Sequence, residues 1–458
     1  MRITAFIAAA ALVLGHGALA WTETKVNDHV HESCTYMNTQ IIHKTVPGTA
    51  PSWFGDYCTY FLDAHNNKYE GTPKVAAEEK FEPPEVIDRK AQELVELINE
   101  SKHFIAFTGA GSSTSAGIPD FRGPDGAWTL RAQGRQRTGK TVSTLQAIPT
   151  PTHMALAELA NRGMLKYLVS KNCDGLHRKS GLHPDKLSEL HGNSNREYCK
   201  DCGKDYIRDF RAVAKYEKTV HDHRTGRKCA RCGGALHDSI INFGEALPED
   251  ALRNAYDHAK AADLCLVLGS SLTVSPANDI PATICRKRKA ELVICNLQKT
   301  PFDCLSKLRV YSRTDDLMIR VMEKLGIPIP PFVLHRRMLV ELQKVNEEQH
   351  KLVVHGVDVD GTPVTFLRSV KLTNNRRVAR TEPFELVFRD EVTPGMEFAL
   401  QLEFMGHYGE PNLEIVYTVP ECPGSPKTLY LLRYHPTTGV WETSWQDGAG
   451  VGDGLETA

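Results

Sequence analysis

Short apolar runs recur through the middle of the chain, and small or polar residues follow each of them. The clearest runs cover residues 104–107, 165–169, 264–268 and 292–295. Near-continuous apolar runs of this length are typical of strands that are buried on both faces of a parallel sheet. Segments with helical spacing lie between them, as at residues 86–99. The alternation predicts an α/β fold in which helices cover both faces of a parallel sheet.

The last quarter of the chain has a different pattern, in which short alternating runs are separated by Gly, Pro and Asn. The runs cover residues 364–367, 384–388, 398–404, 413–417 and 429–432. This pattern predicts a β-rich, sandwich-like domain over residues 351–435. We expect a linker or charged helix over residues 333–350 before it, and a tail over residues 436–458 after it. Two roles stay open for this domain, a binding module or a stabilising cap.

The start of the chain has the composition of a secretory signal. Residues 1–20 combine a basic residue, an apolar run and a small-residue cleavage pattern, and they are too short to span a membrane. An N-terminal extension and linker follow over residues 21–84, where Cys34 and Cys58 would pair if the segment were secreted. Two interpretations stay open: a genuine secretory form, or a first segment wrongly joined to an intracellular protein.

Length and composition narrow the class of protein further. A chain of 458 residues is long enough for two or three domains with complete cores. A formal net charge of −1 gives no bulk attraction to nucleic acid or to a membrane surface. Twelve cysteines are too few in this length for a disulfide scaffold.

A glycine-rich turn follows the first apolar run. Gly109 and Gly111 let the backbone turn sharply and approach a ligand, and the small polar residues 112–115 suit a following helix start. Unpaired N–H groups at such a turn bind phosphate. A strict dinucleotide fingerprint has a third glycine where Thr114 stands, so the turn alone also fits an ordinary strand–helix connection. An acidic residue, an aromatic and an arginine at 120–122 have the composition of a cofactor lid.

The sequence GAGSSTSAGIPDFRG at 109–123 resembles the first NAD-binding motif of the sirtuins, the NAD-dependent protein-lysine deacylases. The resemblance covers residues 85–332 and implies a Rossmann-like sheet. Residues 128–130, 172–174 and 315–318 are most similar to the class IV branch, which is mostly nuclear. The motifs agree in order as well as in content.

A second motif, at residues 170–177, resembles the sirtuin segment whose Asn and Asp lie in the nicotinamide pocket. These roles fall on Asn172 and Asp174, and an amide with a carboxylate matches the donors and acceptor of a carboxamide. The chain departs from the family at Lys171, where Gln is usual, and at Ser112, where an aliphatic residue is usual.

A histidine before a glycine, His191, corresponds to the general base of the family. Imidazole suits proton transfer because its ordinary pKa is close to physiological pH. His177 and His183 are the competing positions, and a structural role for any of the three is the alternative. By resemblance, further cofactor contacts fall on the following residues: Gly109, Ala110, Gly111, Asp120, Phe121, Arg122, Gly269, Ser270, Ser271, Asn296, Leu297 and Thr314.

Two C-x2-C pairs predict a metal site. Cys199 and Cys202 are separated from Cys229 and Cys232 by residues 203–228. Four thiolates satisfy a tetrahedral zinc ion and leave no open position, so we expect one structural Zn²⁺ in a small lobe over residues 196–236. The lobe is inserted between the two halves of the predicted sheet.

The resemblance implies an NAD-dependent protein-lysine deacylase, a deacetylase first of all. The acyl oxygen attacks the ribose carbon as nicotinamide leaves, His191 acts as base, and the products are lysine, nicotinamide and O-acyl-ADP-ribose. Segments 240–245 and 274–278 correspond to the family's peptide-pairing loops. The expected partner is an acylated-lysine protein such as a histone, and no membrane span is expected. Two roles stay open for the basic residues 205–228: contact with chromatin, or a solvated charged face, which we favour.

Two alternatives share these motifs: mono-ADP-ribosyl transfer to a protein, and non-enzymatic binding of NAD or chromatin. The expected location is the nucleus by resemblance, or the cytoplasm, and residues 1–20 conflict with both. We favour the interpretation of a wrongly joined first segment, because free NAD and reduced cysteines are intracellular conditions.

Overall fold

The computed structural model describes residues 24–26, 29–31, 78–136, 141–215, 221–242, 245–373, 377–389, 391–420 and 427–448. The signal-like residues 1–20, Cys34 and Cys58 lie outside them. Two short strands, β1 (Thr24–Val26) and β2 (His29–His31), pair in antiparallel fashion. The remaining described residues belong to two compact units, which divide the chain near residues 193, 240 and 330.

The first unit contains a six-stranded sheet in the order β12-β11-β10-β3-β4-β5, with all neighbours parallel. Its strands are β3 (Phe104–Thr108), β4 (Leu165–Ser170), β5 (Leu187–Glu189), β10 (Leu264–Leu268), β11 (Glu291–Cys295) and β12 (Leu308–Val310). The chain starts in the middle at β3, runs outward to β5, and returns to β10 on the other side. This is the Rossmann order, and its switch point lies between β3 and β10.

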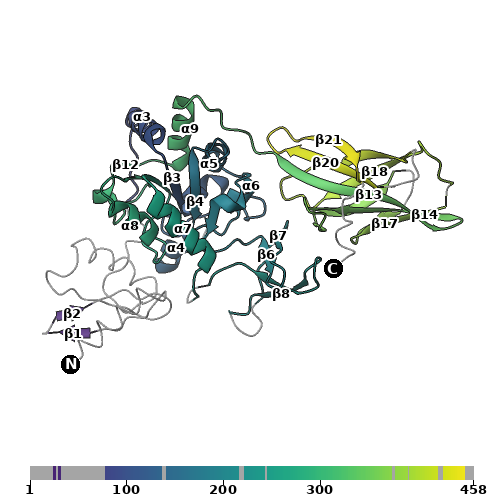
Figure 1. The fold of residues 1–458 in the computed structure, drawn as a ribbon, viewed down its shortest axis with the longest axis horizontal. Coiled ribbons are helices and arrows are strands. Elements are labelled where there is room, and N and C mark those ends of the chain that lie inside the picture. Colours follow the sequence, from purple (N-terminus) through teal and green to yellow (C-terminus); the bar gives the residue numbers. More distant parts are fainter. Residues whose placement is uncertain are drawn as a thin grey trace. The chain divides into compact units, whose positions relative to one another are not determined.

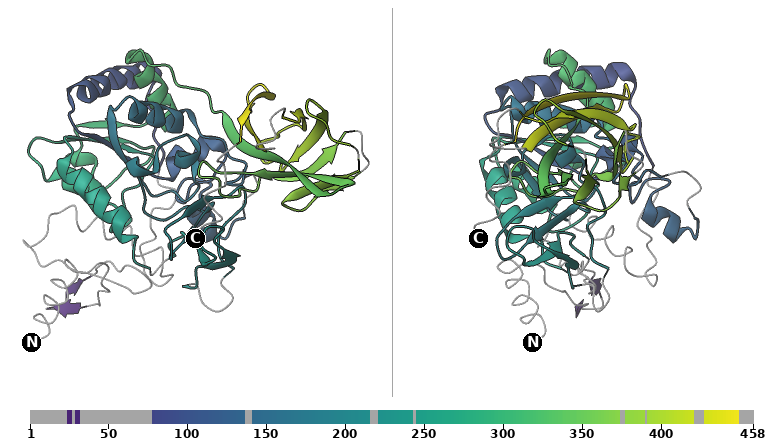
Figure 2. Two further views of the ribbon diagram at one scale, coloured as in Figure 1. Left: turned by 45° about the vertical axis from the view of Figure 1, so that its right-hand side comes forward. Right: turned by 90° about the vertical axis from the view of Figure 1, so that its right-hand side faces the viewer.

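Helices cover both faces of this sheet (Figures 1 and 2). The α-helices are α3 (Pro84–Glu100), α4 (Ala127–Ala132), α5 (Pro151–Asn161), α6 (Leu176–Lys179), α7 (Glu249–Ala261), α8 (Asp279–Cys285) and α9 (Thr314–Lys324). Among the described residues, four single turns are 3₁₀: η2 (Ala110–Ser112), η3 (Thr114–Ala116), η4 (Pro184–Lys186) and η5 (Asp303–Leu305).

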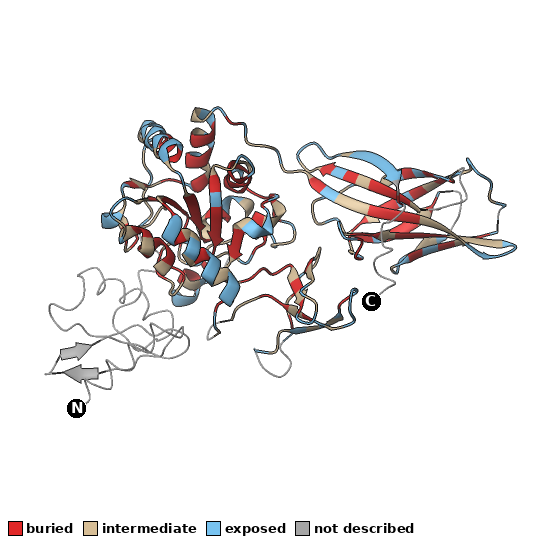
Figure 3. Cartoon of the chain, in the orientation of Figure 1, coloured by how far each residue is buried: buried red, intermediate tan, exposed pale blue. Residues whose placement is uncertain are grey.

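Strand β3 shows how the two faces are built. Phe104 and Ala106 pack in one apolar core with α3, α5 and α9, whereas Ile105 and Phe107 pack in a second core with α7 and α8. Alternate side chains of a strand point to opposite faces, so a strand between two helical layers must be apolar throughout. Figure 3 shows the strands buried and the outer helix faces exposed. The predicted α/β sheet is therefore confirmed.

The second unit contains a small antiparallel sheet in the order β7-β6-β9-β8. Its strands are β6 (Arg196–Cys199), β7 (Asp205–Ile207), β8 (Arg224–Lys228) and β9 (Ala235–Asp238). In sequence this lobe lies between β5 and α7, as an insertion between the halves of the parallel sheet.

The rest of the second unit is a sandwich of two antiparallel sheets, in the orders β17-β14-β13-β20-β21 and β16-β15-β18-β19. The strands are β13 (Leu334–Asn346), β14 (Gln349–Gly356), β15 (Leu367–Leu372), β16 (Val378–Ala379), β17 (Phe384–Phe388), β18 (Glu397–Phe404), β19 (Leu413–Thr418), β20 (Lys427–His435) and β21 (Val440–Asp447). One core of apolar residues, which includes Tyr417 and Phe384, lies between the sheets and confirms the predicted β-rich domain.

The structure corrects two sequence predictions at the ends of this domain. Residues 333–350, predicted as a linker or charged helix, consist largely of strand β13, which pairs with β14 and β20. Met338 and Val340 point to the same face and into the sandwich core. Charged residues on both sides of the short apolar stretch 338–340, such as Arg337 and Glu341, hide this period in the sequence. Residues 436–458, predicted as a tail, contain strand β21, whose Trp441 packs against the same core.

Within the second unit, ion pairs join the small lobe to the sandwich. The Lys204 ammonium lies 3.1 Å from an Asp358 oxygen and 2.8 Å from an Asp360 oxygen. Among the helices that the structure describes, none is both long and apolar enough to cross a bilayer.

Candidate active site and metal centre

Two glycine turns touch at the switch point of the parallel sheet. Gly109 follows β3 and Gly269 follows β10, and the Gly111 N–H donates to the Gly269 carbonyl at 2.9 Å. A Cβ on Gly109 would lie 2.7 Å from that carbonyl oxygen. A Cβ on Gly269, where φ is +63°, would lie 2.5 Å from the Gly111 carbonyl carbon. The turns therefore need glycine, both for the close approach and for the left-handed backbone.

Two cavities adjoin this contact, and the predicted site residues line them. The first, of about 360 Å³, is lined by Gly109, Ala110, Gly111, Asp120, Phe121, Arg122, Asn172, Asp174, His191, Gly269, Ser270, Ser271 and Asn296, among others. The second, of about 550 Å³, is lined by Gly111, Asp120, Gly269, Asn296, Leu297 and Thr314, among others. The structure thus brings together all the predicted catalytic and cofactor residues, in a space of the size that small-molecule sites usually have.

The Asn172 and Asp174 side chains are held by the first glycine turn. Asn172 Nδ2 donates to the Gly109 carbonyl at 3.0 Å and to the Ser112 and Ser113 hydroxyls at 3.2 Å each. Asp174 accepts from the Ser113 hydroxyl at 2.7 Å and from the Leu176 N–H at 2.9 Å. Because Nδ2 is used internally, the amide oxygen of Asn172 is the atom left to accept a ligand's N–H.

Ser112, one of the two departures from the family pattern, supports this arrangement. Its side chain is fully buried, donates to the Gly109 carbonyl at 2.8 Å and accepts from Asn172. A hydroxyl at this position is therefore satisfied within the site, and it adds a contact to the residue expected to bind nicotinamide.

The protonation state of His191 follows from one hydrogen bond. His191 Nδ1 lies 2.9 Å from the Lys171 carbonyl oxygen, which only accepts, so Nδ1 carries the proton. Nε2 of the neutral ring is then a bare acceptor, as a general base requires. Burial, and after it the Lys171 charge, lowers the pKa of His191 to about 4, so the ring is neutral at physiological pH.

Lys171, the second departure, lies in the same cavity. Burial, followed by the charge of Arg122, lowers the pKa of Lys171 to about 7. Within the part of the chain that the structure describes, no carboxylate forms an ion pair with its ammonium. The residue therefore places a weakly basic amine beside the imidazole.

The two competing histidines lie outside both cavities. His177 is buried, bonds the Thr108 hydroxyl through Nε2 at 2.8 Å, and lies 4.5 Å from the His153 ring between centroids. Burial lowers the pKa of both rings. His183 is 65% exposed and caps the start of η4, with its ring 3.5 Å from an Asp185 oxygen. Of the three candidates, only His191 faces the predicted cofactor residues.

Sequence reasoning missed several residues of the second cavity, and Glu79 and Phe81 lie the furthest from any predicted motif. They precede α3, in the stretch predicted to be a linker. Their acidic and aromatic side chains gave no motif, because the contacts that place them are made with residues late in the chain.

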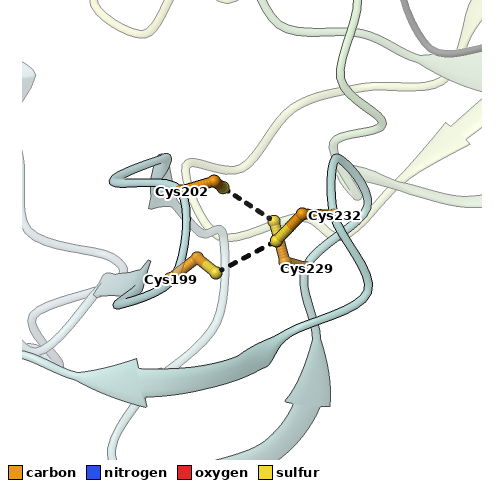
Figure 4. A group of neighbouring side chains, drawn as sticks. All are labelled: Cys199, Cys202, Cys229 and Cys232. Atoms are coloured by element: carbon orange, nitrogen blue, oxygen red, sulfur yellow. Dashed lines mark hydrogen bonds between the residues drawn. The ribbon is translucent and has the colours of Figure 1, made fainter. Parts of the chain in front are cut away.

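Four cysteines gather in the small lobe, from the turns after β6 and β8 (Figure 4). Their sulfur atoms all lie within 4.8 Å of one another, with Cys199 and Cys232 at 3.4 Å and Cys202 and Cys229 at 3.6 Å. Sulfurs that share a tetrahedral zinc lie about 3.8 Å apart, whereas a disulfide needs about 2.05 Å. The geometry fits one structural zinc ion with no position left for a substrate.

A doubly wound sheet whose glycine turns meet at the switch point, beside a cavity with a neutral histidine, defines a dinucleotide-binding α/β protein. A family model described as "Sir2 family" matches residues 133–276. The NAD-dependent protein deacetylase SRT1 of Arabidopsis thaliana is 37% identical over 356 residues, which cover 72% of this chain and 73% of that protein.

Two animal proteins are also similar to this chain. The NAD-dependent protein deacetylase Sirt6 of Drosophila melanogaster is 40% identical over 283 residues, which cover 60% of this chain and 87% of that protein. The NAD-dependent protein deacetylase sirtuin-7 of Homo sapiens is 39% identical over 280 residues, which cover 59% of this chain and 68% of that protein. The chain therefore belongs to the Sir2 family.

Removal of one cysteine should abolish metal binding. We expect Cys199→Ser to lower zinc from about one ion per chain to almost none, because the tetrahedral site loses a thiolate that nothing replaces. Elemental analysis by mass spectrometry measures the metal, and thermal unfolding measures the loss of stability in the lobe. Cys304→Ser, at an exposed cysteine outside the cluster, is the control. Stoichiometric zinc in Cys199→Ser would show that the four sulfurs are not the ligands.

Lys171→Gln should raise the pKa of His191. A protonated His191 is disfavoured by the Lys171 charge, so its removal stabilises the imidazolium and moves the titration to higher pH. Histidine-selective ¹³C labelling and NMR titration measure this shift directly. Lys166→Gln, at an exposed position on β4, the strand that Lys171 follows, is the control and should leave the titration unchanged. An unshifted His191 titration in Lys171→Gln would contradict the electrostatic coupling.

Proposed function

We propose that this chain is an NAD-dependent protein-lysine deacetylase, which moves the acyl group of a lysine onto ADP-ribose and releases nicotinamide. The observation that carries the proposal is the position of His191. It shares one cavity with the glycine turn, Asn172 and Asp174, and its only bare nitrogen is Nε2. A neutral base beside an anion-binding turn is what the acyl transfer needs.

Some residues of the cavity bind the cofactor, and one, His191, transfers a proton. The turn at Gly109 and Gly111 offers close backbone approach to a pyrophosphate. The amide oxygen of Asn172 and the carboxylate of Asp174 both accept hydrogen bonds, and they orient nicotinamide through the N–H groups of its carboxamide. When bound, NAD supplies the ribose that accepts the acyl oxygen as nicotinamide leaves. His191 Nε2 then takes the proton of a ribose hydroxyl, and its Nδ1–H stays bonded to the Lys171 carbonyl.

We place the peptide substrate between segments 240–245 and 274–278. Ile240, Ile241 and Asn242 from the first segment line the cavity of His191, as does Val274 from the second. The Ile241 N–H also donates to the His191 carbonyl at 3.2 Å, which ties the first segment to the base. An extended peptide between them would reach the base with its acyl-lysine side chain, and backbone pairing of this kind tolerates many sequences.

We propose a nuclear location and histone substrates, from the likeness to the proteins named Sirt6 and sirtuin-7. The small lobe gives less support to direct contact with DNA than to a protein substrate. Arg208 and Arg227 both pair with the buried Glu197, at 2.7 and 2.8 Å. Arg224 pairs with Asp222 at 2.8 Å. Three arginines of the basic spacer thus already have carboxylate partners within the lobe, so a protein substrate is the favoured partner.

Product analysis tests the function. The full chain is incubated with NAD and an acetyl-lysine peptide, and the products are identified by mass spectrometry. We expect nicotinamide, deacetylated peptide and O-acetyl-ADP-ribose in equal amounts, and no nicotinamide without peptide. A mass gain on a protein with the peptide unchanged would instead indicate ADP-ribosyl transfer. No nicotinamide from a zinc-loaded chain would indicate a binding protein.

His191→Ala should lower turnover by at least ~100-fold, because it removes the base while the cavity and the fold remain. The rate of nicotinamide release with peptide measures the loss, and zinc content and the unfolding midpoint check the fold. His183→Ala, at an exposed histidine outside the cavity, is the matched control. Full deacetylation by His191→Ala would refute the assignment of the base.

A further inference from the structure

A short stretch before α3, here called the leading segment (residues 78–83), is fastened across the carboxyl ends of two strands. The Lys80 N–H donates at 2.9 Å to the carbonyl of Leu297, which follows β11. The Glu82 N–H donates at 2.9 Å to the carbonyl of Tyr311, which follows β12. Backbone bonds at alternate residues mark an extended conformation, so neighbouring side chains point in opposite directions.

Side-chain contacts strengthen the same attachment. The Glu82 carboxylate accepts from Lys90 Nζ at 2.5 Å and from the Tyr311 N–H at 3.2 Å. The Lys80 ammonium lies 5.8 Å from the centroid of the Tyr311 ring. Lys80 and Glu82 thus anchor the leading segment to the sheet. The side chains of Glu79 and Phe81 point to the opposite side of the segment.

Glu79 and Phe81 both line the second cavity, together with Asn296, Leu297 and Thr314. Phe81 is 58% exposed, so much of its ring is open to solvent at the mouth of the cavity that it lines. No described side chain forms a hydrogen bond or an ion pair with the Glu79 carboxylate. Burial, and next the nearby charge of Asp120, raises the pKa of Glu79, although the charge of Arg313, which also lines the cavity, acts in the opposite direction.

We propose that the leading segment completes the adenosine subsite, with Glu79 accepting hydrogen bonds from the adenosine ribose hydroxyls and Phe81 packing against the adenine ring. The inference rests on the proposed function in one respect, namely that the dinucleotide is NAD. A carboxylate that accepts from a 2′-hydroxyl repels a 2′-phosphate, so Glu79 makes the site selective for NAD over NADP. An aromatic face at the open end of a cavity offers a planar base a stacking surface.

Binding measurements on the full chain test the proposal without any need for catalysis. Isothermal titration calorimetry with NAD, ADP-ribose and NADP gives the dissociation constants. For Glu79→Gln we expect roughly tenfold weaker binding of NAD and ADP-ribose, since a charged acceptor is lost, and a smaller ratio between NADP and NAD. Glu78→Gln is the matched control, because that neighbouring carboxylate is exposed and does not line the cavity.

Phe81 has its own pair of variants. Phe81→Ala should weaken the binding of NAD and of NADP by the same factor, because stacking on the adenine ring does not depend on the group at the 2′ position. Phe81→Tyr should retain the affinity. Thermal unfolding checks that each variant keeps its fold. Unchanged affinity in Glu79→Gln, or an equal loss in Glu78→Gln, overturns the role of Glu79. Unchanged affinity in Phe81→Ala overturns the role of Phe81.

The outcomes separate this inference from the proposed function. A chain that binds NAD and responds to Glu79→Gln but does not deacetylate refutes the function alone. A chain that deacetylates with Glu79→Gln unaffected refutes the inference alone. A chain that binds neither NAD nor ADP-ribose refutes both.

Discussion

The contact between the two glycine turns is the constraint on which the rest of the site depends. Strands β3 and β10 pair in register from Phe104 with Leu264 to Thr108 with Leu268, so they end at the same level. The next residues, Gly109 and Gly269, then meet with no room for a side chain. Because the turns touch, they form one continuous surface at the switch point of the sheet, and residues of both turns line both cavities.

A series of hydrogen bonds carries this geometry from the turns to the base. The Lys171 N–H donates to the Thr108 carbonyl at 3.1 Å, and the Leu190 N–H donates to the Ser170 carbonyl at 3.0 Å. His191 then donates from Nδ1 to the Lys171 carbonyl. Each strand end thus fixes the next along the sheet edge. The orientation of His191 is a property of the parallel sheet, more than of any side chain near the imidazole.

The parts that the sequence predicts correctly are those whose chemistry is local. Apolar runs mark buried strands, glycine marks the turns, and paired cysteines mark the zinc lobe. Long-range contacts leave no such mark. Lys80 is placed by Leu297, far away in the chain, so the leading segment has the composition of a linker. Strand β13 is not predicted for a different reason, since charged residues such as Arg337 and Glu341 lie next to its core residues Met338 and Val340 and conceal their period.

The two departures from the family pattern, Ser112 and Lys171, show at which positions the side chain can change while the geometry of the site is kept. Ser112 is tolerated because Asn172 and the Gly109 carbonyl satisfy its hydroxyl. Lys171 is tolerated because it orients His191 through its backbone carbonyl, which any residue supplies. Its side chain adds only charge, and burial lowers its pKa to about 7, so above that pH the amine is mostly neutral. A lysine in place of glutamine therefore leaves the position of the base unchanged and alters its electrostatic surroundings mainly below neutral pH.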